Sequence, residues 1–278
     1  MNPENIENTE EGEGRGRIVV SDSHYASGEA EYLLCIALDI GEGILASGGE
    51  VNRVEDTVTR ICEAYGAVHT EVFAIPSLII ATVHLESGEH ATLIRRLGGT
   101  SNNLLRLEMY NDISYKICRT TPPLSEVEET VKAVKIKSRQ PSWLSVLGSV
   151  LGAGSFAVFF GGTWRDGLVT AFIGAVLALL DLIPSGSVNR FAKIAVQSFV
   201  GGMLGYLSVM LGIGENVDMI NIGSIMLLIP GLSFGTALRD LLYGDFLAGS
   251  LKTVQVVLLA LMIAFGYMLA MIVMGGAV

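Results

Sequence analysis

Residues 254–274 read VQVVLLALMIAFGYMLAMIVM, and this stretch decides the fold because it holds no charged side chain. A helix of about 20 apolar residues crosses a lipid bilayer. Working back to Trp143, four more apolar stretches of similar length occur, interrupted by glycines and lone polar groups. Residues 141–278 therefore predict an all-α bundle of five transmembrane helices, at about 143–162, 167–183, 191–213, 219–238 and 254–274.

The whole chain is too apolar for an ordinary soluble domain. Half of its 278 residues are hydrophobic, 17% are charged, and its mean hydropathy is +0.52. The net charge of −10 belongs almost entirely to residues 1–140, which carry 22 acidic and 13 basic side chains. No basic patch indicates a nucleic-acid partner. The partner that this composition predicts is the lipid bilayer.

The first 140 residues have the mixed periodicity of a soluble domain. Residues 1–25 are polar and acidic, and we expect them to form a disordered tail. From residue 26 to 140 helical and strand periods alternate, which predicts a cytoplasmic α/β domain in front of the bundle. Its expected helices cover residues 29–46, 50–65, 103–119 and 125–137, and its expected strands cover 68–74, 78–85 and 91–96.

Basic residues are unevenly distributed between the two sides of the predicted bundle. Arg190, Lys193, Arg239 and Lys252 fall on the side of the N-terminal domain, whereas Arg165 stands alone on the other side. Positive charge near the ends of spans marks the cytoplasmic side. We therefore expect a multi-pass protein with its N-terminal domain in the cytoplasm and its C-terminus outside.

A carboxylate stands at the end of the second predicted span. Asp181 is costly inside a bilayer, and such a group usually marks the path of an ion or a polar solute. Pro184, Asn189 and Arg190 follow, so an interrupted helix of the kind that lines transporter sites is one interpretation. The alternative is a plain cytoplasmic loop with a helix cap. We expect burial to raise the pKa of Asp181 towards neutrality, which suits proton exchange.

The fourth predicted span is also interrupted. Pro230 and Gly231 stand side by side near its middle and weaken the helix, so they either expose carbonyl groups for a solute or produce a simple kink. Arg239 and Asp240 follow at its inner edge. We expect Arg239 to attract a carboxylate, with Asp240 orienting it or titrating as a second group.

Two amides are expected in the interior of the bundle. Gln197 in the third span and Asn221 in the fourth could hydrogen-bond a solute or join neighbouring helices. Glycines four residues apart also predict close approach between helices. The three pairs are Gly148 and Gly152, Gly201 and Gly205, and Gly231 and Gly235.

The densest motif of the N-terminal half is a glycine turn followed by a charged helix start. Ser47-Gly48-Gly49 precedes a helix with a strongly polar face. The polar face consists of Glu50, Asn52, Arg53, Glu55, Asp56 and Arg60. A glycine turn at a helix N-terminus can bind an anion, but these carboxylates would repel one. The favoured interpretation is a solvated helix face that docks on its neighbour.

Signs of metal binding or catalysis are weak. His84, Glu86, Glu89 and His90 lie close together in sequence but straddle a predicted hairpin, so ordinary turn charges are favoured over a metal site. The chain has no P-loop and no serine-nucleophile motif. Gly244-Asp245 only faintly resembles the signature of intramembrane aspartyl proteases. We therefore predict no metal, no cofactor and no enzymatic activity.

Several segments resemble the threonine/serine exporter family. The first is GILASGGEVNRVED at residues 43–56, with Arg60-Ile61 and Ala64-Tyr65-Gly66 after it. Ile183-Pro184-Ser185, Pro230-Gly231, Arg239-Asp240 and Gly244-Asp245 then follow in the order that the family has. The resemblance extends over about residues 28–274.

The resemblance implies an exporter of small polar metabolites, driven by the proton-motive force, in a prokaryotic inner membrane. The family includes L-threonine and L-serine exporters and two-component exporters of dicarboxylates such as succinate. Its full-length members continue into a second membrane region, which is not found in these 278 residues. We therefore expect a second, small membrane subunit as partner, or a homo-oligomer.

The hypothesis that follows gives each half of the chain a part in export. The cytoplasmic domain would receive the small-molecule substrate, and spans two to four would line its route. Asp181 is the expected coupling group, Asn189, Gln197 and Asn221 would hydrogen-bond the solute, and Arg190 would attract its carboxylate. The alternative is a membrane-anchored sensor or assembly protein whose cytoplasmic domain binds a ligand.

Overall fold

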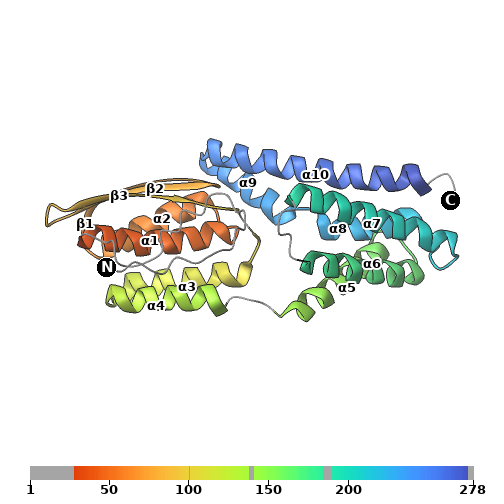
Figure 1. The fold of residues 1–278 in the computed structure, drawn as a ribbon, viewed down its shortest axis with the longest axis horizontal. Helices are drawn as coiled ribbons and strands as arrows, with labels where there is room; N and C mark the ends of the chain where they lie inside the picture. Colours follow the sequence, from red (N-terminus) through yellow and green to blue (C-terminus); the bar gives the residue numbers. More distant parts are fainter. Residues whose placement is uncertain (1–27, 100, 138–140, 184–188, 275–278) are drawn as a thin grey trace, which may run out of the picture.

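The computed structural model describes residues 28–99, 101–137, 141–183 and 189–274. The molecule is elongated, with the N-terminal domain at one end and a helical bundle at the other (Figure 1). The tail expected at residues 1–25 and the turn residue Pro184 lie outside the described residues.

The N-terminal domain consists of four helices and one small sheet. Helices α1 (Glu29–Ala46) and α2 (Val51–Ala64) come first, and α3 (Leu104–Thr120) and α4 (Leu124–Lys137) come last. Between them β1 (Ala67–Ile75), β2 (Leu78–Leu85) and β3 (His90–Arg96) pair antiparallel in the order β1-β2-β3. Each element begins and ends within a few residues of its predicted bounds, because the hydrophobic period changes clearly at the glycine and proline turns.

Helix α1 is the centre of this domain. The sheet covers one side of α1 and α2, and α3 and α4 lie on the other side (Figure 1). Leu34 and Ile44 of α1 are fully buried, as is Ile79 on the covered face of the sheet. Tyr110 of α3 packs against α1 at Gly43, where a Cβ atom would overlap its ring. The domain thus has a hydrophobic core of its own, so the polar face of α2 and the turns of the domain can contact the bundle.

Six helices follow in the bundle: α5 (Ser142–Phe159), α6 (Trp164–Leu182), α7 (Arg190–Met210), α8 (Val217–Leu228), α9 (Gly231–Tyr243) and α10 (Phe246–Met274). Three of them, α5, α7 and α10, are long and apolar enough to cross a membrane, and the bent pair of α8 and α9 makes a fourth if it is one span. The predicted interruption of the fourth span is confirmed: α8 and α9 meet at 55° around Pro230, which lacks the N–H that a continuous helix needs. Helix α10 also begins well before the predicted Val254.

Helix α6 corresponds to a predicted span but is not among the helices that are long and apolar enough to cross a membrane. Its apolar stretch between Asp166 and Asp181 has only 14 residues, shorter than a bilayer usually requires. It nevertheless packs along α5 through glycines, since Gly174 lies against the carbonyl of Ser149 and Gly154 against that of Gly167. Five crossings therefore stay a prediction.

Close approach of helices in the bundle depends on glycines, although not on all the predicted pairs. Gly201 and Gly205 of α7 do lie against neighbouring helices, next to Tyr267 and Asn221. A Cβ atom at Gly148, Gly231 or Gly235 would meet nothing within 4 Å. These three positions leave open surface in the single chain.

The two ends of the bundle are fixed by different polar contacts. At the end far from the domain, the Asp166 carboxylate accepts hydrogen bonds from the backbone N–H of Thr163 at 2.9 Å, Glu215 at 2.7 Å and Asn216 at 3.1 Å. These bonds join the α5–α6 turn to the α7–α8 turn. The C-terminal end of α6, the N-terminal end of α7 and the α9–α10 connection therefore lie at the opposite end, on the side of the N-terminal domain (Figure 1).

Candidate functional site

The glycine turn between α1 and α2 places a helix start directly against the bundle. Helix α1 ends at Ala46, Gly48 adopts the left-handed φ of +92°, and the N–H of Gly49 returns to the carbonyl of Ile44. This closure of a helix C-terminus requires a residue without a Cβ atom. It reverses the chain so that the first turn of α2 faces α9 and α10. We call this contact region, formed by residues 48–55, 233–245 and 252, the domain junction.

A buried ion pair lies at the centre of the domain junction. The Nζ of Lys252 is 2.7 Å from Oδ2 of Asp240, and the two side chains are 10% and 1% exposed. Lys252 also donates to the carbonyl of Gly49 at 3.2 Å, while Asp240 accepts from the N–H of Val51 at 3.3 Å. Buried charges persist only when they are paired and hydrogen-bonded. Each member of this pair thus joins the bundle to the turn of the N-terminal domain.

Further polar contacts surround the pair. Arg239 of α9 binds Glu50, the residue before α2, and Arg53 lies 3.8 Å from the same carboxylate. The Asn102 amide donates to the Ser233 hydroxyl at 3.3 Å, at the first turn of α9. These contacts match the interpretation that the charged helix start docks on its neighbour. Other members of the predicted motif lie elsewhere: Asn52 is exposed, and Asp56 pairs with Arg60 at 3.0 Å along α2.

Two further carboxylates make the junction rich in negative charge. Glu55 accepts a hydrogen bond from the N–H of Ala74 at 2.8 Å, and burial raises its pKa above the usual range, with Asp245 and Asp240 adding to the rise. Burial and the nearby Asp240 also raise the pKa of Asp245, which lies in the connection between α9 and α10. One oxygen of Asp245 is buried and has no hydrogen-bond partner among the described residues.

A narrow cavity of about 20 Å³ adjoins the ion pair, large enough for about one water molecule. It lies between the glycine turn, the start of α9 and the first turns of α10. Its polar lining combines two cations with amide and hydroxyl groups. The polar residues are Asn102, Arg190, Ser233, Thr236, Lys252 and Gln255.

The structure separates the residues that the sequence predicted for one pathway. Asp181 is not buried: its side chain is 73% exposed and pairs with Lys193 at 3.0 Å, because it ends α6 at the surface. Asn189 caps α7 by accepting from the N–H of Phe191 at 3.1 Å, as the loop-and-cap alternative expects. Gln197 donates to the carbonyl of Leu177 on α6 at 3.3 Å, an interhelical bond. Whether any of these residues takes part in transport stays a prediction.

Of the remaining predicted residues, Asn221 lies inside the bundle and Arg190 at the cavity. The Asn221 Oδ1 atom is buried beside Gly205 and has no hydrogen-bond partner among the described residues. Pro230 and Gly231 form the break that precedes α9, so they set the direction of the helix that carries Ser233 and Asp240.

Sequence reasoning missed the central lysine. Lys252 was used only to orient the bundle, and Asn102 and Gln255 were not considered. A usable signal existed, because Lys252 is the one charged residue of α10, and a lysine in such an apolar helix needs a buried partner. Nothing in the sequence identified Gly49 or Asp240 as that partner.

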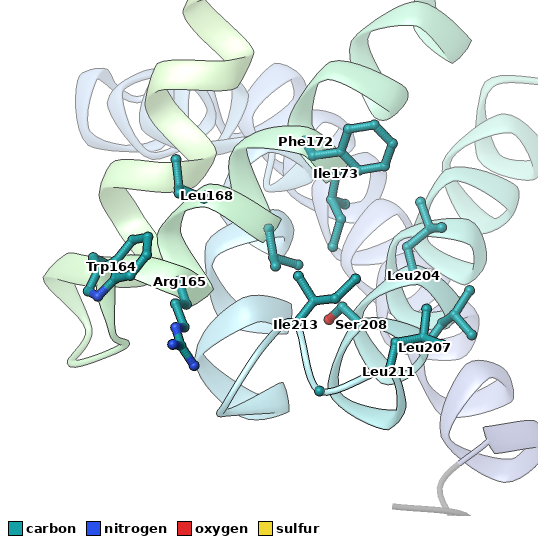
Figure 2. Close-up of a pocket in the computed structure, with 12 residues that line it drawn as sticks. Trp164, Arg165, Leu168, Phe172, Ile173, Leu204, Leu207, Ser208, Leu211 and Ile213 are labelled. Carbon is teal, nitrogen blue, oxygen red and sulfur yellow. The ribbon is translucent and has the colours of Figure 1, made fainter.

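A second, wider cleft lies elsewhere and has a different character. It measures about 640 Å³ and lies between α6 and α7 at the far end of the bundle, with Trp164, Phe172 and Leu211 among its lining (Figure 2). Its few polar groups are Arg165 and Ser208, and Arg165 pairs with Glu215 at 3.3 Å. Such a surface suits an acyl chain or an apolar helix better than a small polar solute.

The histidines of the sheet lie next to one another across its three strands. His69, His84 and His90 stand opposite one another on neighbouring strands and their rings contact in a row. Within the described ranges, no group of three or more His, Cys, Asp or Glu side chains is placed to hold a metal ion. Glu86 and Glu89 belong to the turn between β2 and β3.

Comparison with known proteins gives the family. Residues 35–274 match the family model ThrE, described as a threonine/serine exporter. The chain is 26% identical over 237 residues to a protein of Klebsiella aerogenes named as a probable succinate transporter subunit, YjjP, covering 84% of this chain and 90% of that protein. It is 25% identical to pheromone-regulated membrane protein 10 of Zygosaccharomyces rouxii, covering 84% of this chain but 24% of that longer protein. No solved structure matches.

The family match covers the domain junction and every helix from α2 to α10, so it applies to both halves of the molecule. It also favours a membrane exporter over an anchored sensor, because the family model and the Klebsiella relative are both described as transporters. This chain belongs to the threonine/serine exporter family.

Proposed function

We propose that the chain is one component of an exporter, driven by the proton-motive force, that carries small carboxylate metabolites across a prokaryotic inner membrane. The substrate is an amino acid such as L-threonine or L-serine, or a dicarboxylate such as succinate. A second, small membrane subunit completes the route. The N-terminal domain lies in the cytoplasm, and α6 completes five crossings because it returns along α5 to the end that faces the domain.

The observation that carries this proposal is the polar lining of the cavity at the domain junction. Arg190 and Lys252 supply positive charge, and Ser233, Thr236 and Gln255 supply groups that hydrogen-bond a carboxylate or an amino group. The break at Pro230 turns the N-terminus of α9, the positive end of its dipole, towards the same place. Interrupted helices that aim this end at an anionic substrate group are a feature of transporters.

The cavity as described is too small for a metabolite, which gives the N-terminal domain its part in the mechanism. For a substrate to enter, the glycine turn must move away from α9 and α10. The contacts that would break are those of Lys252 with Gly49, of Asp240 with Val51, and of Asn102 with Ser233. A junction of few polar contacts suits repeated opening better than an extensive apolar interface would.

The test is solute movement in proteoliposomes containing the full chain, with and without the candidate second subunit. We expect exchange of labelled threonine, serine or succinate, and competition by the free acid but not by its amide, because the cations recognise the carboxylate. Arg190→Gln should raise the half-saturating substrate concentration about 10- to 100-fold, the cost of a hydrogen bond to a charged group. Arg165→Gln, which removes a cation at the far end, is the matched control.

Two results would contradict the proposal. Absence of solute exchange in every combination of subunits would contradict the proposal that the chain is part of an exporter. Equal competition by acids and amides would contradict the proposal that the cavity recognises a carboxylate. Ligand binding without movement of solute would instead favour a membrane-anchored sensor.

A further inference from the structure

The carboxylates of the domain junction are unevenly paired with cations, which substrate binding does not explain. Four acidic side chains meet there: Glu50 and Glu55 from the region of α2, Asp240 from α9, and Asp245 from the α9–α10 connection. The facing cations are Arg53, Arg239 and Lys252, with Arg190 of α7 across the cavity. Arg53 and Arg239 both approach Glu50, and Lys252 pairs with Asp240.

Asp245 therefore differs from the other three carboxylates. Its oxygen Oδ2 is buried and has no hydrogen-bond partner among the described residues, while the residue as a whole is partly buried. Its position is fixed, because its N–H donates to the carbonyl of Asp240 at 2.9 Å and its carbonyl accepts from Gly249 at 2.8 Å. Ionisation of this carboxylate is disfavoured: burial and the nearby Asp240 raise the pKa of Asp245, although the charge of Lys252 acts in the opposite direction.

We propose that Asp245 is the proton-exchanging group of this exporter, and that its protonation holds the N-terminal domain against the bundle. This assignment rests on the proposed function for its role in transport. When Asp245 releases its proton, the O–H bond breaks, the proton passes to water on the domain side, and a carboxylate remains. The new charge repels Asp240 and Glu55 and competes for Lys252.

Loss of the proton thus weakens the contacts that close the cavity. Lys252 drawn towards Asp245 leaves both Asp240 and the carbonyl of Gly49, and the N–H of Val51 loses its acceptor if Asp240 moves. One proton thereby controls access of the substrate to the cations of the cavity. Asp181, which is exposed and already paired with Lys193, lacks this connection to the junction.

The direction of the pH dependence follows from the raised pKa of Asp245 in the docked state, which burial and Asp240 cause. The docked state, in which the N-terminal domain lies against the bundle, is most stable when Asp245 is protonated. Its stability falls as the pH rises from the ordinary aspartate pKa to the raised pKa, and above the raised pKa its stability stays constant.

Docking can be measured with one cysteine pair, Asn102→Cys with Ser233→Cys, whose side chains already touch. We expect the rate of disulfide formation in the full chain, divided by the rate in Asp245→Asn at the same pH, to fall as the pH rises. Rates are compared between backgrounds at each pH, so that ionisation of the thiols cancels. Asp112→Asn, an exposed aspartate on α3, is the matched control and should behave as the parent.

Transport provides the second readout. In proteoliposomes, Asp245→Asn should lose accumulation driven by a pH gradient while keeping exchange of substrate in the absence of a gradient. Asp245→Glu, which retains a titrating group, should keep both the coupling and the pH-dependent docking, so a general folding defect is distinguished from loss of the proton site.

The experiments distinguish failure of the proposed role of Asp245 from failure of the proposed transport function. If the parent protein exchanges carboxylates and the Asp245→Asn variant has the same docking and coupling as the parent, the role of Asp245 is overturned and the exporter proposal stands. If the parent shows pH-dependent docking that Asp245→Asn abolishes, but exchanges no carboxylate, the control of docking by Asp245 is supported and the proposed function is overturned. Loss of pH dependence in Asp245→Glu as well would overturn the titration of this residue.

Discussion

Lys252→Met is expected to lower the free energy of unfolding by about 3–5 kcal/mol, the usual cost of removing one partner from a buried ion pair. Methionine keeps the length and the apolar stem of lysine, so the main loss is the charge. The Asp240 carboxylate, 1% exposed, then remains without its counter-charge, and the carbonyl of Gly49 loses its donor. Chemical unfolding of the full chain in mild detergent measures this change.

A double variant separates the structural part of this pair from its functional part. Asp240→Leu combined with Lys252→Met should recover most of the lost stability, because apolar residues of similar volume often replace a buried ion pair without a net cost. Transport should not recover, since one of the two cations of the cavity, Lys252, is still absent. Arg165→Met breaks an exposed ion pair and should cost no more than about 1 kcal/mol. If Lys252→Met costs no more than Arg165→Met, the buried pair does not hold the junction together.

Gly266→Ala is expected to separate α7 from α10. An added Cβ atom would lie 2.5 Å from the carbonyl oxygen of Ala195 and 2.8 Å from the backbone nitrogen of Phe199. These are backbone atoms of α7, which cannot move aside as a flexible side chain can. Overpacking of this kind costs about 1–3 kcal/mol, and we expect the upper end because two helices must shift. Thermal unfolding in detergent and the yield of folded protein report the effect.

The matched control for this prediction is Gly148→Ala on α5. That glycine is also helical, but a Cβ atom there meets nothing within 4 Å. Alanine is the better helix former by about 0.8–1 kcal/mol, so the variant should be as stable as the parent or slightly more stable. Equal melting temperatures for Gly266→Ala and Gly148→Ala would show that α7 and α10 do not pack as tightly as described.

The local features of the chain were largely predictable. The helices and strands of the N-terminal domain lie where the hydrophobic period and the glycine turns predicted them, and the family resemblance is confirmed by the match over residues 35–274. The break at Pro230 was also visible in the sequence. Its consequence was not, because a proline predicts that a helix bends but not by how much, and the 55° between α8 and α9 depends on what each half packs against.

Burial of single charged groups was the main failure. Asp181 and Asp240 look alike in the sequence, since both stand at the inner end of an apolar stretch. The structure leaves Asp181 at the surface and buries Asp240 almost completely. The difference arises because the N-terminal domain covers the end of α9 and leaves the end of α6 uncovered.

The sequence by itself predicted which segments are apolar enough for a membrane, which form a separate α/β domain, and which family the chain resembles, because apolar length, periodicity and short motifs are properties of neighbouring residues. Only the tertiary structure decided that Gly49 and Val51 meet Lys252 and Asp240, residues 203 and 189 positions away. Whether a carboxylate is buried, paired or able to hold a proton depends on such distant groups, so the candidate site became visible only once the domain and the bundle were seen together.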